Sequence, residues 1–134
     1  METKPTIPTA KAPSHYFTGD VYVDPICRGE DPSRMIVSSV HFAPSARTNW
    51  HSHAHGQTLH VTDGIGLVVS RDGTVIRMRP GDTVYTPPGE EHWHGAPEDK
   101  FMCHLAMLGG TNDGDGTTWL EPVTNEQYRA AHQQ

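Results

Sequence analysis

Hydrophobic and polar residues alternate through the middle of the chain with the two-residue period of β-strands. Side chains of an extended strand point to opposite faces in turn, so this alternation predicts strands with one buried face. Turn-forming residues separate the runs and keep each of them short. The expected strands are Val21 to Val23, Met35 to Phe42, Thr48 to His53, Gln57 to Val61, Gly66 to Ser70, Val75 to Met78, Thr83 to Thr86, His92 to Gly95 and Phe101 to Leu108.

The turn-forming residues between these runs predict hairpins, and the length of the chain predicts a single domain. The segment 71–74 contains the Asp-Gly pair of a tight hairpin, and the segment 79–82 contains Pro-Gly. With 134 residues, 13 glycines, 11 prolines and no long helical pattern, the chain predicts an all-β domain over residues 16–134. Residues 1–15, which begin with a Thr-, Pro- and Lys-rich stretch, are expected to form a flexible N-terminal arm. Thr124-x-x-Gln127 has capping-box spacing and predicts a short C-terminal helix.

Charge and composition exclude several classes of function. The net charge is −6 and no basic patch is present, which argues against binding of nucleic acid. No apolar run approaches the length of a membrane span, and the start of the chain lacks the apolar region of a signal peptide, so a cytoplasmic location is expected. Cys27 and Cys103 stand alone in their segments and are expected to be reduced. Asp113 to Gly116 lacks most features of a calcium loop and is expected to be solvated.

Histidines are the main chemical feature of the chain. His51 and His53 are two residues apart, so an extended strand aims both imidazoles at one point. Gln57 keeps the same parity if the chain stays extended, and His92 could add a third imidazole from another strand. Imidazole suits several transition metals, and an amide oxygen broadens the choice. The pattern therefore predicts a metal site on β-strands, with a solvated histidine-rich surface as the alternative.

The last expected strand, Phe101 to Leu108, has two distinct faces. One face carries His104 among apolar residues, and burial should keep that imidazole neutral, as a general base requires. The other face is wholly apolar and needs a cover, for which a second subunit is the usual solution. A homodimer or homotetramer is therefore expected. The residues of this outward face are Phe101, Cys103, Leu105 and Met107.

The same parity predicts a mainly apolar chamber around the metal site. His94, two residues beyond His92, should lie at its mouth, whereas His41 and His60 should face outward. Trp50 and Trp93 point away from the neighbouring histidines and are expected to pack in the scaffold. These wall segments contain no Arg or Lys of matching parity to bind a carboxylate, although Arg47 and Arg71 cannot be placed. The expected walls are Ile36, Ser38, Val40, Phe42, Leu59, Val61, Met102, Ala106 and Leu108.

Gln57 also bears on the reaction. Three neutral imidazoles and a neutral amide leave the full double charge on a divalent ion, whereas a carboxylate would neutralise part of it. A more positive centre is a stronger Lewis acid and favours the divalent state. The ligand set therefore favours proton transfer or bond cleavage over activation of dioxygen.

The spacing of these residues resembles the two signature motifs of the cupin superfamily, G-x5-H-x-H-x3,4-E-x6-G and G-x5-P-x-G-x2-H-x3-N. The first runs from Ser45 through His51, His53 and Gln57 to Gly64, and the second from Gly81 through Pro87, Gly89 and His92 to Ala96. Ser45, Gln57 and Ala96 depart from the pattern. The resemblance implies a double-stranded β-helix, or jelly-roll barrel, with His51, His53, Gln57 and His92 as metal ligands.

A closer resemblance covers most of the chain from about residue 16. The segments 17–19, 46–53, 56–59, 89–96, 104–106 and 123–128 are similar to small bacterial cupins that act as manganese-dependent hydroxynitrile lyases. That resemblance implies Mn(II), with Fe(II), Zn(II), Ni(II) and Co(II) as alternatives, and His104 as the acid/base with His94 beside it. Ser38, Val40 and Leu108 would contact a small apolar or aromatic cyanohydrin or its aldehyde. An Fe(II) oxygenase and a non-catalytic ligand-binding cupin are the alternative functions.

Overall fold

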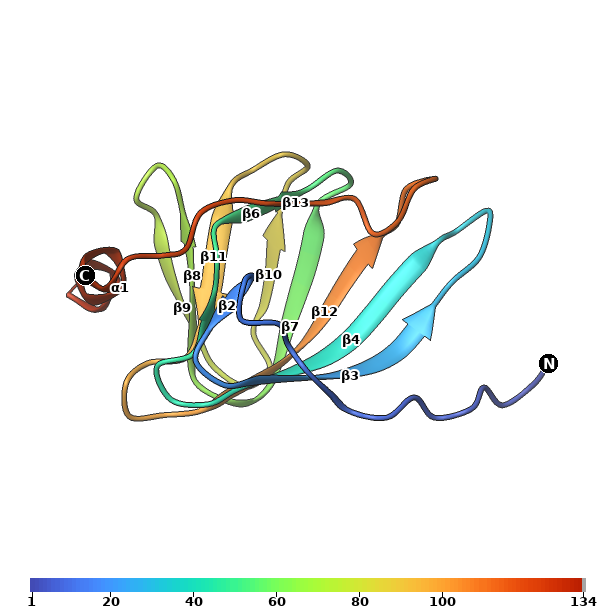
Figure 1. Cartoon of the computed structure of the whole chain (residues 1–134), viewed down its shortest axis with the longest axis horizontal. Coiled ribbons are helices and arrows are strands. Elements are labelled where there is room, and N and C mark those ends of the chain that lie inside the picture. Colours follow the sequence, from blue (N-terminus) through green and yellow to red (C-terminus); the bar gives the residue numbers. More distant parts are fainter. Residues whose placement is uncertain (134) are drawn as a thin grey trace.

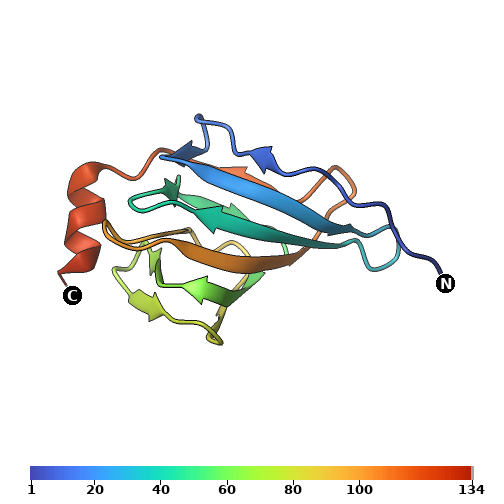
Figure 2. The same cartoon turned by 90° about the horizontal axis from the view of Figure 1, so that it is seen from below.

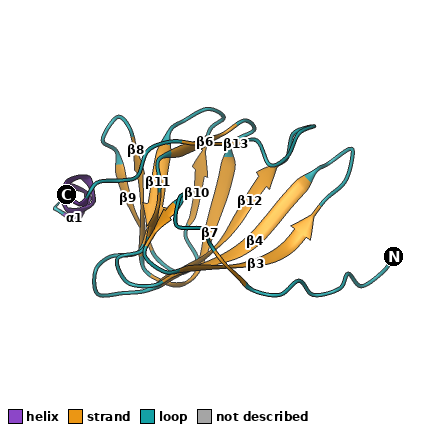
Figure 3. Ribbon diagram, viewed as in Figure 1, coloured by secondary structure: helices purple, strands orange, loops and turns teal. Residues whose placement is uncertain are grey.

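Two β-sheets face each other across a shared interior in the computed structural model, which describes residues 1–133 (Figures 1 and 3). The first sheet has the order β1 (Ala10–Lys11), β3 (Val21–Arg28), β4 (Met35–Phe42), β12 (Met102–Gly109), β7 (Gln57–Gly64) and β10 (Thr83–Thr86). The second has the order β13 (Thr117–Trp119), β6 (His51–His53), β11 (His92–Gly95), β5 (Arg47–Thr48) and β2 (Phe17–Thr18), and β11 also pairs with β8 (Gly66–Ser70), which pairs with β9 (Val75–Met78). The helix α1 (Asn125–His132) lies at one end of the molecule. The expected all-β barrel with a short C-terminal helix is confirmed.

Several strands have the predicted bounds, and the differences have local causes. The expected strand Thr48 to His53 is interrupted, because Asn49 and Trp50 leave the sheet. Their amides donate instead to the carbonyls of Tyr16 and Glu121, at 2.8 and 3.0 Å. The strand β13 was not predicted from the sequence at all.

The strand β3 continues to Arg28, five residues beyond its predicted end at Val23. The strand includes Pro25, although proline cannot donate to a β-ladder. In the structure, β1 pairs only with Tyr22 and Val23, so Pro25 lies on an open edge where no donor is needed. A register shift between Pro25 and Cys27 then changes which side chains of β3 face the interior.

The interior holds a hydrophobic core that corrects part of the predicted chamber. Phe42, Leu59, Val61 and Met102 are almost fully buried and pack together. They fill the core between the sheets and do not line the cavity described below. Burying an aliphatic or aromatic side chain of this size contributes roughly 1.5–3 kcal/mol, so these residues stabilise the barrel.

A second apolar cluster joins α1 to the barrel. Trp50 and Trp93 pack there against Tyr128 and Ala131, which confirms their predicted scaffold role. The predicted capping box is present: Thr124 Oγ1 accepts from the amide of Gln127, and Gln127 Oε1 accepts from the amide of Thr124.

Arg47 and Arg71 both lie outside the barrel interior. Arg47 is buried beneath α1, where it donates to the Val123 carbonyl and lies 4.4 Å from the Tyr128 ring centre. Arg71 lies over the Trp50 ring and forms ion pairs with two surface glutamates.

The N-terminal segment runs along the edge of the first sheet (Figure 2). Ala10 and Lys11 pair with β3, and the N-terminus lies at the opposite end of the molecule from α1. Cys27 and Cys103 are free thiols. Among residues 1–133, no helix is long and apolar enough to cross a membrane.

Candidate functional site

Three buried imidazoles converge between the two sheets. His51 and His53 come from β6, and His92 comes from the neighbouring β11, directly opposite His51 in the register. One ring nitrogen of each lies within 4.8 Å of the corresponding nitrogen of the other two. The two-residue spacing and the antiparallel pairing thus bring together three groups that could hold a metal ion.

Gln57 reaches this point from the opposite sheet. It opens β7 and is buried, and its Oε1 lies 3.3 Å from His92 Nε2. The four side chains that the cupin-like spacing marks as ligands therefore lie together, with donors from both sheets.

Each of the three imidazoles is oriented by a hydrogen bond at Nδ1. The Nδ1–H groups of His51 and His92 donate to the carbonyls of Asn49 and Glu90, at 2.9 and 3.0 Å, and that of His53 donates to Thr117 Oγ1 at 2.9 Å. This leaves the Nε2 lone pairs free to coordinate, which is the usual arrangement of histidine metal ligands. His53 Nε2 is buried without a hydrogen-bond partner, which fits a nitrogen that binds a cation.

Burial keeps these rings neutral. It lowers the pKa of His53 to about 4, and it lowers that of His51 well below its ordinary value, with the neighbouring His92 and His53 adding to the effect. Burial also lowers the pKa of His92. Because only the neutral imidazole coordinates a metal, this donor set fits a divalent cation at neutral pH.

A second pair of histidines lies beside the first three. His94 Nδ1 and His104 Nε2 are 3.0 Å apart, and both residues are buried. Burial lowers the pKa of His104 to about 4. Burial also lowers the pKa of His94 well below its ordinary value, and repulsion between the two rings when both are protonated adds to this effect. Phe42 packs against both rings, with centroids 5.6 and 5.3 Å away. The pair is therefore neutral at neutral pH and shares one N–H between its rings.

A cavity of about 310 Å³ is bordered by His51, His53, Gln57, His94 and His104, whereas His92 does not line it. The predicted substrate contacts Ser38, Val40 and Leu108 line it, as do Ile36 and Ala106. These residues come from β4 and β12, and all except Ser38 are aliphatic. They form one largely aliphatic wall of the cavity. A space of this size suits a small, mainly apolar molecule.

The cavity also has lining residues that sequence reasoning missed. Arg28 lines it and lies outside the segments in which no Arg or Lys of matching parity was found; the register shift in β3 carries this side chain to the inner side. Asp115, which lies in the loop predicted to be solvated, is exposed but also borders the cavity. The aromatic lining residues are Tyr16, Phe17 and Trp119.

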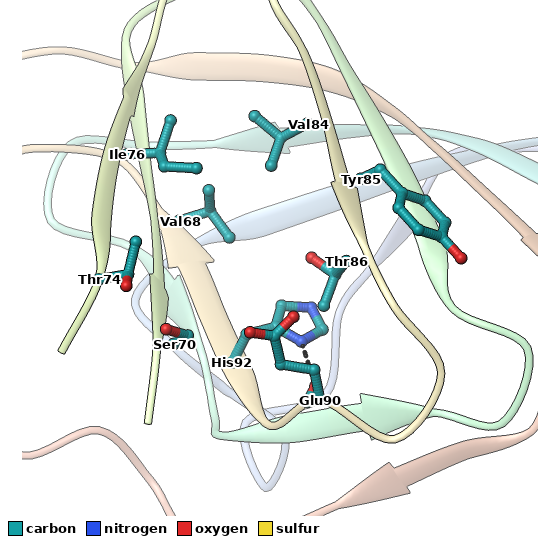
Figure 4. A pocket seen from close by; sticks show the side chains of 9 residues that line it. All are labelled: Val68, Ser70, Thr74, Ile76, Val84, Tyr85, Thr86, Glu90 and His92. Atoms are coloured by element: carbon teal, nitrogen blue, oxygen red, sulfur yellow. Dashed lines mark hydrogen bonds between the residues drawn. The ribbon is translucent and has the colours of Figure 1, made fainter. Parts of the chain in front are cut away.

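A smaller cavity of about 140 Å³ opens between β10 and the β8–β9 hairpin and also contacts His92 (Figure 4). Figure 4 shows the His92 ring beside Thr86, with its hydrogen bond to Glu90. None of the other four clustered histidines lines this space. The larger cavity, which His51, His53, His94 and His104 line, is therefore the candidate site.

The remaining barrel histidines face outward, as predicted. His41 contacts Asp24 Oδ2 at 3.0 Å and Cys103 Sγ at 2.9 Å on the outer face. His60 contacts Thr83 Oγ1 at 2.8 Å, and His55 is exposed in a turn.

The family model of the cupin domain matches residues 38–109, a segment that contains all four clustered ligand candidates and the His94–His104 pair. The chain belongs to the cupin family. This cupin is 46% identical over 121 residues to an (R)-mandelonitrile lyase of Granulicella tundricola, covering 90% of this chain and 92% of that protein.

Solved structures support the same assignment. A cupin-like protein of Thermotoga maritima superimposes with a TM-score of 0.86 at 39% identity, covering 91% of this chain and 92% of that one. A cupin 2 conserved barrel domain protein of Rhodopseudomonas palustris gives a TM-score of 0.70 at 15% identity, covering 95% and 84%, and shows the shared fold alone.

Two departures from the cupin motifs have local explanations. Ser45 stands at a motif glycine and adopts the left-handed conformation that glycine favours, with φ at 71°. Ala96 replaces the final asparagine and is fully buried, and its carbonyl accepts from the Tyr128 hydroxyl at 2.6 Å. The third departure, Gln57, lies in the site itself, where three histidines of a cupin barrel suit a divalent metal.

Proposed function

We propose that this cupin is a metal-dependent hydroxynitrile lyase, which reversibly cleaves a small apolar or aromatic cyanohydrin, such as mandelonitrile, to an aldehyde and hydrogen cyanide. One observation carries the proposal: a neutral His94–His104 pair lines one largely apolar cavity together with His51 and His53 of the three-histidine centre. The 46% identity to an (R)-mandelonitrile lyase over nearly the whole chain supports it.

His51, His53, Gln57 and His92 would hold the metal in this proposal, with Mn(II) as the preferred ion and Fe(II), Zn(II), Ni(II) or Co(II) as alternatives. When bound, the ion supplies Lewis acidity that lowers the pKa of a coordinated hydroxyl. All four donors are neutral, so they do not reduce the charge of the ion. This favours the lyase over an oxygenase, for which two histidines and a carboxylate are a typical iron-binding set.

His104 and His94 would move the proton. Cleavage requires the cyanohydrin hydroxyl to lose its proton as the carbon–carbon bond to cyanide breaks. Uptake of that proton converts the neutral pair into an imidazole–imidazolium hydrogen bond between His104 Nε2 and His94 Nδ1, which is a stronger, charge-assisted bond. The pair then returns the proton to the departing cyanide, so it serves first as base and then as acid.

The cavity wall would orient the substrate and exclude water. Ser38 supplies a hydroxyl among aliphatic neighbours, while Val40 and Leu108 contact the organic group of the substrate. An apolar wall of this kind strengthens the polar interactions at the reacting centre, because it lowers the local dielectric.

Assembly into a homodimer or homotetramer is part of the proposal. The outer face of β12 carries Leu105 and Met107, which are only partly covered, and the adjoining Phe101 is 46% exposed. Cover of this face by a second copy would bury these side chains. A cytoplasmic location also belongs to the proposal, since free Cys27 and Cys103 fit a reducing compartment.

The test is direct. Protein purified without added metal is analysed for metal content, then assayed for cyanide release from mandelonitrile and, separately, for oxygen uptake. The proposal expects a bound divalent ion and cyanide release that stops when the metal is chelated. Metal-dependent oxygen uptake without cyanide release would favour the oxygenase, and neither activity would favour a binding protein.

A further inference from the structure

A stacked aromatic wall faces the larger cavity from the second sheet. The rings of Tyr16 and Trp119 are 4.6 Å apart and nearly parallel, at 12°, and Phe17 packs against Trp119 at 5.4 Å. All three side chains line the cavity. Tyr16 and Trp119 are half-buried, so each has ring surface that its neighbours leave uncovered.

The wall adjoins the candidate metal centre. Trp119 pairs with His51 in the β13–β6 register, and the two ring centroids are 4.7 Å apart. A group packed against Trp119 therefore lies next to the histidine cluster. The largely aliphatic wall that includes Ile36, Val40 and Leu108 faces it from the first sheet.

A buried asparagine holds this wall in place. The amide of Asn49 donates to the Tyr16 carbonyl at 2.8 Å, and its Nδ2 donates to the carbonyls of His15 and Leu120, at 2.9 and 3.2 Å. The Asn49 carbonyl also accepts from His51 Nδ1. One residue, 3% exposed, thus links the Tyr16 segment, the end of β13 and a candidate ligand. The wall is preorganised relative to the histidines, which reduces the ordering that binding requires.

We propose that Tyr16 and Trp119 form an aryl-binding subsite that makes this cupin selective for aromatic over saturated substrates. The inference rests on the proposed lyase function and deepens it. A phenyl ring lies against the two stacked aromatic rings on one side and the aliphatic wall on the other, which places its carbinol carbon beside the histidine cluster. Offset or edge contacts between aromatic rings add binding free energy beyond that from the area that the rings bury. A cyclohexyl ring of similar size obtains only the contribution from buried area.

The experiment compares the metal-loaded wild-type protein with Trp119→Leu and Tyr16→Leu. The matched control is Tyr85→Leu, because Tyr85 is 62% exposed and lies outside the larger cavity. Two readouts are used: the kcat/KM ratio between mandelonitrile and the cyclohexyl analogue, and the Kd ratio between benzyl alcohol and cyclohexylmethanol by calorimetry. The second readout does not depend on catalysis.

The wild-type protein should favour the phenyl member of each pair. Trp119→Leu should reduce that preference roughly tenfold, as expected from the loss of about one aromatic contact. Tyr16→Leu should reduce it in the same direction, Trp119→Phe should retain it, and Tyr85→Leu should leave it unchanged. If Trp119→Leu does not fold, Tyr16→Leu and Trp119→Phe still decide the outcome. Unchanged ratios in the folded Leu variants would overturn the subsite.

The two readouts separate this inference from the lyase itself. Preferential binding of benzyl alcohol that is lost in Trp119→Leu, without any cyanide release by the wild type, would support the subsite and reject the lyase. Cyanide release with ratios unaffected by the Leu variants would support the lyase and reject the subsite.

Discussion

His94 Nδ1 and His104 Nε2 form a buried 3.0 Å hydrogen bond between a strand of the second sheet and a strand of the first. His94 belongs to β11, two residues beyond His92, and His104 lies on the inner face of β12. The bond therefore links the backbone that carries a candidate metal ligand to the proposed acid/base. Removing either ring leaves the other buried with an unpaired nitrogen, which typically costs about 1–3 kcal/mol.

Replacement of His104 should separate chemistry from binding. His104→Ala should keep its metal and its fold but lose about 10²- to 10⁴-fold in the rate of mandelonitrile cleavage, as expected for loss of a general base. His41→Ala and His60→Ala are the controls, because both residues face outward. A His104→Ala protein with the wild-type rate would remove this histidine from the mechanism.

Acid should inactivate the enzyme through the same residue. The pKa of His104 is lowered to about 4 by burial, so the ring is neutral at pH 7 and becomes protonated as the pH falls toward 4. Cleavage of mandelonitrile, measured from pH 7 to pH 4 with metal-loaded protein, should decline over this range. His104→Ala should have a lower rate and lack this part of the decline.

Folding stability should also depend on pH. Because the pKa of His104 is about 4 in the folded protein and near 6.5 when unfolded, the unfolded chain binds more protons between these values. The free energy of unfolding should therefore be highest above pH 6.5 and fall as the pH is lowered from 6.5 to 4. Urea denaturation of chelator-treated protein measures this slope. In His104→Gln the slope should be shallower, and an equal slope in the two proteins would contradict the assignment.

Loss of a ligand should remove the metal. His92→Ala should abolish bound metal and lower the melting temperature of protein prepared with metal, because an ion that binds only the folded state stabilises it by about 2.7 kcal/mol at one hundred times its Kd. Elemental analysis and calorimetry provide the readouts, with His60→Ala as the control. Full metal occupancy in His92→Ala would refute the ligand assignment.

Replacement of Gln57 tests whether a neutral ligand set keeps the metal strongly Lewis-acidic. Gln57→Glu should retain metal, since a carboxylate is at least as good a donor, yet it should slow cyanide release because the added negative charge weakens the Lewis acid. Metal content and kcat are measured together on one preparation. A rate equal to or faster than that of the wild type would show that the neutral amide is not needed for its charge.

The outer face of β12 tests the assembly. Light scattering of the wild-type protein at micromolar concentration should give a dimer or tetramer, and Leu105→Lys should give monomer, because an unpaired ammonium buried in an interface is costly. Ile76→Lys, an exposed position on β9 in the other sheet, should leave the assembly intact. A monomeric wild-type protein would refute the proposed homodimer or homotetramer.

The candidate metal centre was largely predictable because its geometry is local. Side chains two residues apart in a strand share a face, so His51-x-His53 determined a pair of convergent imidazoles. The parity assigned to Gln57 required an extended chain, but a turn at residues 54–56 intervenes, and Gln57 reaches the site from the opposite sheet. The same rule predicted His104 on an inner face. It also assigned Leu59 and Val61 to the cavity, which was wrong, because parity gives a side chain's face but not its position along the barrel.

The rest depended on pairings between distant segments. The sequence alone determined an all-β chain, its principal strands, the capped helix and a set of residues suited to a divalent metal. Only the tertiary structure decided that Trp119, on a strand of three residues, packs against His51, and that Tyr16 stacks on Trp119. A strand so short has no readable alternation, and its position comes from hydrogen bonds to β6 and to Asn49, which lie far away along the chain. The physical reason is that local patterns specify faces, whereas the packing of whole sheets specifies neighbours.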